Sequence, residues 1–248
     1  MGPRPDALFA EIVRLQGDTP WGSVLDAGTG RHSLSFVKSL PTARWTALTA
    51  RRDPVLDASV ERADDRIVVG NWTDSALLAG ESFDTVLVDY VVGALDGFAP
   101  YFQDAFFARL RQHCRGRVYV IGLEPYGAAH DEGGAIVWEI ARLRDACILL
   151  AGDRCYREYP RAWVKQRMTE AGFEIASDDA FPIRYGARFV NGQLDVCRRK
   201  LSRIDGVVRG ALGARIENVA ARAHGYLARV GEIRFGEDYL ISATVKRV

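Results

Sequence analysis

The sequence lacks the features that mark membrane and secreted proteins. Within its 248 residues, no stretch reaches the roughly 18–20 consecutive apolar residues that a membrane-spanning helix needs. The first residues, MGPRPDALFAEIVRLQGD, have no apolar core of the kind found in a secretory signal peptide. These two absences predict a cytoplasmic protein without a membrane partner.

Cysteine and excess charge are also scarce. The four cysteines are irregularly spaced and form no C-x-x-C pair, which predicts reduced thiols and neither a disulfide framework nor a metal site. They are Cys114, Cys147, Cys155 and Cys197. The formal net charge is +1, so the protein has no overall field that would attract a nucleic acid. No serine or cysteine lies in a nucleophile elbow.

The sequence does have the composition of a large α/β domain and one glycine-containing turn. Hydrophobic residues make up 48% and charged residues 26%, which is usual for globular proteins. Residues 23–30 read SVLDAGTG. The apolar residues of this stretch indicate a buried parallel strand, and Gly28 and Gly30 indicate a tight turn into a helix that begins near Arg31. Free N–H groups at that helix start suit a carboxylate or another anion.

Asp26 distinguishes between two kinds of nucleotide-binding turn. A dinucleotide-binding turn reads G-x-G-x-x-G/A, whereas the third position here is Ser33. A carboxylate just before the loop would repel a pyrophosphate, but it would attract an ammonium or a sulfonium group. The residues therefore favour a ligand with a cationic end over a dinucleotide.

The D-x-G-x-G pattern of Asp26, Gly28 and Gly30 resembles the first motif of the class I S-adenosylmethionine-dependent methyltransferases. The resemblance implies S-adenosyl-L-methionine as the cofactor, with its amino-acid end held by these three residues. His32, directly after the loop, could approach the carboxylate of that cofactor.

The second strand, expected over 44–49, departs from the family pattern. The family usually ends this strand in an acidic residue that accepts hydrogen bonds from both ribose hydroxyls. The aligned residue here is Thr49, and Asp53 lies four residues further on. The resemblance therefore places Thr49 or Asp53 opposite the ribose.

The third strand, expected over 66–69, is followed by Asn71 and Trp72. The resemblance implies that Asn71 accepts a hydrogen bond from the adenine amino group, which its side-chain carbonyl is able to do. Trp72 could stack on adenine, or it could be half-buried packing.

Acidic residues end or follow the fourth and fifth strands, expected over 84–89 and 117–123. Open α/β sheets bind ligands at the carboxyl ends of their strands, so Asp89 is expected to line the methionine side of the cofactor. The candidate catalytic residues, which could orient a nucleophile or take its proton, are Asp89, Tyr90, Glu124 and Tyr159. Alternatively, Glu124 caps a loop or pairs with an arginine. Further candidates are Tyr126, His130, Tyr156, Glu158, Arg184 and Tyr185.

The alternation of strands and helices predicts an α/β fold, with a mostly parallel sheet and helices on both faces. The resemblance implies a Rossmann-like sheet of seven strands, the sixth over 173–177 and an antiparallel last strand over 238–245. Two stretches are additional to the strands and helices that such a sheet domain needs, and they are expected to form a helical lid. The predicted organisation is a cofactor-binding half at 1–125, a lid insertion at 126–159, a core helix and the sixth strand at 160–180, a helical lid insertion at 181–235 and the last strand at 236–248.

The resemblance implies methyl transfer from S-adenosylmethionine to an N, O, S or C nucleophile of a small molecule under the lid. A homodimer interface is the alternative explanation for the apolar stripes of the lid helices. Two other functions stay open. One is a catalytically silent regulatory or scaffold protein that binds S-adenosylmethionine or a nucleotide, which Thr49 favours. The other is a nicotinamide-dependent oxidoreductase, which Asp26 and Ser33 disfavour. Methylation of a protein or an RNA is disfavoured by the near-neutral charge.

Overall fold

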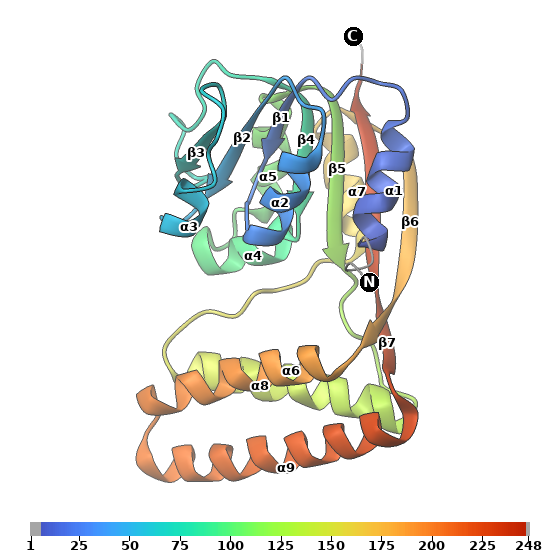
Figure 1. Cartoon of the computed structure of the whole chain (residues 1–248). Helices are drawn as coiled ribbons and strands as arrows, with labels where there is room; N and C mark the ends of the chain where they lie inside the picture. The colour runs from blue at the N-terminus through green and yellow to red at the C-terminus, as the bar shows by residue number, and fades with distance from the viewer. Residues whose placement is uncertain (1–5, 247–248) are drawn as a thin grey trace. The chain divides into compact units, whose positions relative to one another are not determined.

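The computed structural model describes residues 6–246 and contains a seven-stranded sheet (Figure 1). The strand order is β3-β2-β1-β4-β5-β7-β6; β1 to β5 pair in parallel, and β7 is antiparallel to β5. The strands are β1 (Ser23–Asp26), β2 (Arg44–Thr49), β3 (Arg66–Val69), β4 (Phe83–Asp89), β5 (Cys114–Leu123), β6 (Phe173–Tyr185) and β7 (Ile233–Val245). The predicted Rossmann-like, mostly parallel sheet is confirmed.

The last two strands are longer than the sequence suggested. β6 continues from residue 177 to Tyr185, and β7 begins at Ile233 instead of residue 238. The predicted end of β6 is wrong because β6 lies at the edge of the sheet, where most of its side chains are exposed or half-buried. An edge strand tolerates polar residues and a proline such as Pro182, so the polar run at 177–179 does not end it.

Helices cover both faces of the sheet (Figure 1). On one face lie α1 (Ala7–Gln16), α2 (Arg31–Ser39) and α3 (Pro54–Asp57); on the other lie α4 (Val91–Phe98), α5 (Gln103–Arg111) and α7 (Arg161–Glu170). The first face packs around Trp45 and Tyr119, and the second around Phe83, Phe106 and Phe107. Because β1 and most of β4 are buried from both sides, their central residues are apolar: Val24 and Leu25 in β1, and Val86, Leu87 and Val88 in β4.

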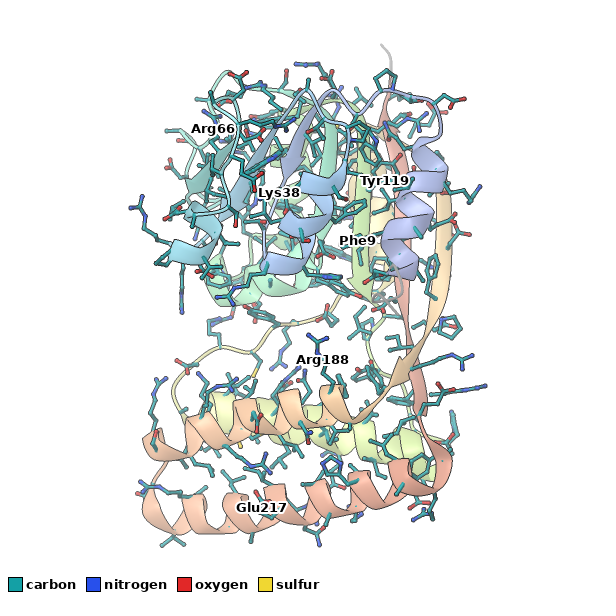
Figure 2. All side chains as sticks on the ribbon, viewed as in Figure 1. Phe9, Lys38, Arg66, Tyr119, Arg188 and Glu217 are labelled. Atoms are coloured by element: carbon teal, nitrogen blue, oxygen red, sulfur yellow. The ribbon has the colours of Figure 1, made fainter. Side chains whose placement is uncertain are left out.

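Helix α1 is fixed to the sheet by aromatic packing and a buried hydrogen bond. Phe9 stacks on Phe36 of α2, with 4.1 Å between ring centroids, and the Tyr119 hydroxyl on β5 donates to Gln16 Oε1 at 2.7 Å (Figure 2). At the other end of the helix, Asp6 accepts from the Leu8 N–H at 2.9 Å and caps α1. These contacts hold Asp6 against the first face of the sheet.

The chain divides into two compact units. The sheet unit comprises residues 6–124, 157–181 and 238–246, and the helical unit comprises residues 125–156 and 182–237. The divisions fall within β6 and β7, so both strands belong to both units. No helix between residues 6 and 246 is both long and apolar enough to span a membrane.

The helical unit packs three helices around one apolar core. These are α6 (Glu132–Leu150), α8 (Ala187–Lys200) and α9 (Gly206–Val230), with a short 3-10 turn, η1 (Leu201–Arg203), before α9. The core includes Ile140, Leu194 and Val219, which are fully buried. Glu139 on α6 also forms ion pairs with Arg215 and Arg222 on α9. The two stretches that exceed a minimal sheet domain therefore form one unit with its own core.

Asp84 ties together the amino-terminal ends of β1, β4 and β5. Its carboxylate accepts from Ser23 N–H and Ser23 Oγ, both at 2.8 Å, and from Arg115 Nε at 2.7 Å. The Arg115 guanidinium and the Ser23 donors lower the pKa of Asp84 to about 2. The charged carboxylate is therefore part of the folded structure.

We expect Asp84→Asn to lower the free energy of unfolding by about 1 kcal/mol at pH 7, after allowance for solvent screening. Because the pKa of Asp84 is lowered in the folded state, its stabilising effect is present above the ordinary carboxyl pKa and is lost as the pH falls toward 2. Urea unfolding at pH 7 and pH 3 should show a smaller difference between the two proteins at pH 3. An undiminished difference at pH 3 would contradict this account of the ion pair.

Candidate functional site

The glycine-containing turn is held in place by backbone hydrogen bonds to both neighbouring strands. Ala27 N–H donates to the Leu87 carbonyl of β4 at 2.8 Å, and Thr29 N–H donates to the Leu48 carbonyl of β2 at 2.6 Å. A side chain at Gly28 would collide with Val91, since an added Cβ would lie 2.5 Å from a Val91 methyl carbon. At Gly30, the cap of α2, an added Cβ would meet nothing within 4 Å. Gly28 is therefore required for packing, whereas the space beside the Cα of Gly30 is empty and its N–H donates to Ser33 Oγ at 3.0 Å.

Asp26 ends β1 as a fully buried carboxyl group. Neither of its oxygens has a hydrogen-bond partner within residues 6–246. Burial raises its pKa to about 6; the neighbouring hydroxyls of Thr29 and Ser33 and the Gly28 N–H oppose this rise without completing a hydrogen bond of normal geometry. A buried carboxyl group without a partner costs folding free energy, so this arrangement points to a missing cationic or hydrogen-bonding ligand.

Asp89 ends β4, the strand beside β1, as a second carboxyl group of the same edge. Burial and the negative charge of Asp26 raise its pKa to about 7, while His32 acts in the opposite direction. At this pKa Asp89 exchanges protons near neutral pH. The structure thus brings together Asp26 and Asp89, as the sequence predicted.

Tyr90 connects this edge to a residue that sequence reasoning missed. Its backbone is left-handed, with φ 51°, and its N–H donates to the Ile121 carbonyl at 3.0 Å. Its side chain interacts electrostatically with Asp238 on β7, since each of the two groups shifts the pKa of the other. Burial raises the pKa of Asp238 to about 6 and keeps Tyr90 protonated. The sequence held a signal for Asp238, because an antiparallel strand beside β5 begins where β5 ends.

His32 and Asp6 complete the group of titratable side chains at this edge. His32 Nε2 lies 3.0 Å from a carboxylate oxygen of Asp6, and the imidazole stacks on Phe9. Asp6 raises the pKa values of both Asp89 and Asp238 by charge repulsion. No sequence pattern pointed to Asp6, whose position follows from the packing of α1 onto the sheet.

The two residues predicted to face the ribose are engaged with their own chain. Thr49 Oγ1 donates to the Arg51 carbonyl at 2.9 Å. Asp53 accepts from the Val55 N–H at 2.9 Å as the cap of α3, and it lies 3.6 Å from the Arg31 guanidinium. Either side chain would have to exchange one of these contacts to hold a ribose.

The predicted adenine residues have different surroundings. Asn71 Oδ1 accepts from the Thr73 N–H at 3.0 Å and from the Thr73 hydroxyl at 2.9 Å, and Asn71 Nδ2 donates to the Phe98 carbonyl at 2.6 Å. Trp72 is 5% exposed, and its indole N–H donates to the Ala27 carbonyl at 2.8 Å. Trp72 therefore packs in the core against Phe106 and has little surface left for an adenine ring.

The other two predicted catalytic residues lie together at the start of α7. Glu124 accepts from the Arg161 N–H at 2.8 Å, which is the capping role considered for it from sequence. The Tyr159 ring packs on Trp163, with 4.4 Å between centroids, and its carbonyl accepts from the Tyr239 hydroxyl at 3.1 Å. These residues contact the face of the sheet that α7 covers, whereas Tyr90 packs with the opposite face.

Several remaining candidates belong to the helical unit. The hydroxyls of Tyr126 and Tyr185 lie 2.5 Å apart, and Arg184 pairs with Glu232 at 2.5 Å. Within the described part of the chain, no group of three or more His, Cys, Asp and Glu side chains could hold a metal ion.

No protein-family model matches the chain, and no curated protein matches it in sequence. Solved structures do match its fold. A candidate methyltransferase of Bacillus halodurans C-125 aligns over 96% of this chain and 99% of its own, with a TM-score of 0.60 and 14% identity. A 1,6-didemethyltoxoflavin N1-methyltransferase of Burkholderia thailandensis, solved with S-adenosylhomocysteine and 1,6-didemethyltoxoflavin, aligns over 98% and 80%, with a TM-score of 0.53 and 16% identity.

A methyltransferase of Archaeoglobus fulgidus that depends on S-adenosylmethionine aligns over 96% of this chain and 92% of its own, with a TM-score of 0.53 and 14% identity. The chain has the class I methyltransferase fold. At these identities the likeness establishes the fold alone. Within the class I methyltransferase fold of this chain, the carboxyl edge that carries Asp26 and Asp89 is the candidate site.

We expect Asp89→Asn to stabilise the protein without ligand at pH 8, by about 1–2 kcal/mol, and to have a smaller effect at pH 5. The pKa of Asp89 is raised in the folded state, so ionisation of the folded protein costs free energy once the pH exceeds the ordinary carboxyl range. The asparagine does not ionise. Thermal unfolding at the two pH values measures this difference, and an equal effect at both would mean that Asp89 is not held in a site that opposes its charge.

Proposed function

We propose that this protein is an S-adenosylmethionine-dependent methyltransferase that acts on a small molecule. The observation that carries the proposal is Asp26, a fully buried carboxyl group with two unpartnered oxygens, placed directly before a glycine-containing turn. A positively charged ligand group would supply the missing partner. Structures of the same fold that contain S-adenosylhomocysteine support this choice of ligand.

The residues of the turn suit the amino-acid end of the cofactor. Asp26 would accept hydrogen bonds from its ammonium group, and the start of α2, next to the empty space at Gly30, would receive its carboxylate. Asp89 would line the methionine side. Thr49 or Asp53 would hold the ribose after exchanging a present contact, and Asn71 would face the adenine through the same kind of exchange.

When bound, the cofactor supplies an electrophilic methyl group, so the protein has to position an acceptor and, for a protonated acceptor, remove its proton. Asp89 is the strongest candidate for the base, because its pKa of about 7 allows it to take a proton near neutral pH. Tyr90, Glu124 and Tyr159 are positioning candidates. Glu124 is already used as a cap, which makes it the weaker candidate for proton removal.

We further propose that the helical unit serves as a lid over the acceptor. Chain connectivity supports this role, because the first segment of this unit follows the carboxyl end of β5 and its second includes the continuation of β6. A 1,6-didemethyltoxoflavin methyltransferase of the same fold binds a small aromatic acceptor, which is consistent with a small-molecule acceptor here. A homodimer interface is the alternative role for the unit, and we place the protein in the cytoplasm.

A second candidate function is cofactor binding without methyl transfer. The engaged side chains of Thr49 and Asn71 favour it, because the protein would need to break existing contacts to hold a nucleoside. A [4+2]-cyclase, SpnF, also shares the fold, with a TM-score of 0.51 and 14% identity, and so shows that the fold supports other chemistry.

We expect calorimetric titration to show micromolar binding of S-adenosylmethionine and S-adenosylhomocysteine, and no binding of NADH. Asp26→Asn should weaken both adenosyl ligands at least about tenfold, since it removes the charge that pairs with their ammonium group. Glu174→Gln is the matched control: it removes one negative charge from an exposed position of β6 and should change neither affinity.

Two results would contradict the proposal. If NADH binds and the adenosyl ligands do not, the protein is an oxidoreductase. If the adenosyl ligands bind equally well to Asp26→Asn, the anchor of the site is elsewhere. Binding without transfer of a labelled methyl group to any of a panel of amine, phenol, thiol and carboxylate acceptors would favour the binding protein.

A further inference from the structure

The carboxyl edge of the sheet carries more negative charge than an ammonium ion alone would balance. Asp26, Asp89 and Asp238 have no ion pair with lysine or arginine anywhere in residues 6–246. Asp6 adds a fourth carboxyl group, and His32 contacts Asp6 at 3.0 Å and lowers the pKa of Asp89. Because Asp26 is fully buried and unpartnered, the group is arranged around a ligand and is not a solvated acidic patch.

We propose that this acidic edge selects its ligand by charge, so that it binds the sulfonium form of the cofactor more tightly than the neutral thioether product and releases protons as the cation enters. The inference rests on the proposed function and adds to it a preference between cofactor and product. Such a preference would favour product release after each methyl transfer.

The physical basis is the sharing of protons among neighbouring buried acids. Without a ligand, burial favours the protonated forms of Asp26, Asp89 and Asp238, and repulsion adds to this effect at Asp89 and Asp238; the pKa values lie at about 6, 7 and 6. Both ligands carry an ammonium group, but only the cofactor carries a second positive charge. That charge favours ionisation of a further carboxyl group, and the proton of that group is released to solvent.

The groups that face Asp89 come from every element packed around it. Asp26 comes from β1, His32 from α2, Asp6 from the segment before α1, and Asp238 from β7. The fifth is Tyr90, which follows Asp89 directly in the chain and interacts electrostatically with both Asp89 and Asp238. Asp238 therefore acts on the ligand through its charge, which makes it a positioning residue.

The test is calorimetric titration of the full chain with S-adenosylmethionine and with S-adenosylhomocysteine at pH 5.5, 6.25 and 7.0. The upper limit keeps the α-ammonium group of both ligands protonated. We expect the affinity ratio of cofactor to product to rise by about three- to tenfold over this range, since one additional proton released would give tenfold per pH unit. Titrations in phosphate and in Tris at pH 7.0 should show more protons released by the cofactor than by the product.

The variant Asp238→Asn provides a second readout. It should reduce the rise in the affinity ratio while leaving the binding of the neutral thioether within about twofold. Glu237→Gln is its matched control, because it removes a charge from the adjacent exposed position of β7 and should leave the pH dependence unchanged. Circular dichroism establishes that both variants are folded.

An affinity ratio that stays constant from pH 5.5 to 7.0, with equal proton release for both ligands, would overturn this inference while leaving the proposed function in place. Failure of both ligands to bind at every pH would overturn the proposed function as well. Because the series on the unaltered protein answers the question by itself, an unfolded Asp238→Asn does not prevent a decision.

Discussion

The arrangement of this protein depends on the burial of one carboxyl group, that of Asp26. Asp26 lies at the carboxyl end of the central strand β1, where helices on one face of the sheet and the neighbouring strand β4 exclude water. A carboxyl group in such a place has to bind a proton or a cation. The glycine-containing turn, the start of α2 and the neighbouring acids form the surroundings of this carboxyl group.

The two ends of the parallel sheet meet opposite electrostatic requirements. At the amino-terminal end, Asp84 is satisfied by Ser23 and Arg115, and its pKa is lowered. At the carboxyl end, Asp26 has no hydrogen-bond partner among residues 6–246, and the pKa values of Asp26 and Asp89 are raised. The same residue type thus stabilises the fold at one end and costs stability at the other, which is typical of a division between structural and functional regions.

Local sequence was a good guide where a single residue type allows one role. The carboxylate before two glycines separated this turn from a dinucleotide-binding turn, and the alternation of apolar runs with helices gave the sheet. The same reasoning was poor at Trp72, because an aromatic residue after a strand suits a ligand and a core equally well. In the folded protein the Trp72 indole N–H donates to the Ala27 carbonyl at 2.8 Å, which shows that the side chain belongs to the core. Reasoning from local sequence also placed the end of β6 at residue 177, whereas the strand continues to Tyr185 because polar residues are tolerated at the edge of a sheet.

By itself, the sequence determined the α/β sheet, the turn after β1 and the positions of Asp26 and Asp89 at the carboxyl ends of their strands, because these follow from residue types over short distances and from the rule that parallel strands end at one edge. Only the tertiary structure decided that Asp238 and Asp6 join them, that Asn71 and Asp53 are engaged in turns and caps, and that Glu124 caps α7. Those roles depend on which side chains meet after the chain has folded, and contacts between residues far apart in sequence leave no local pattern to read.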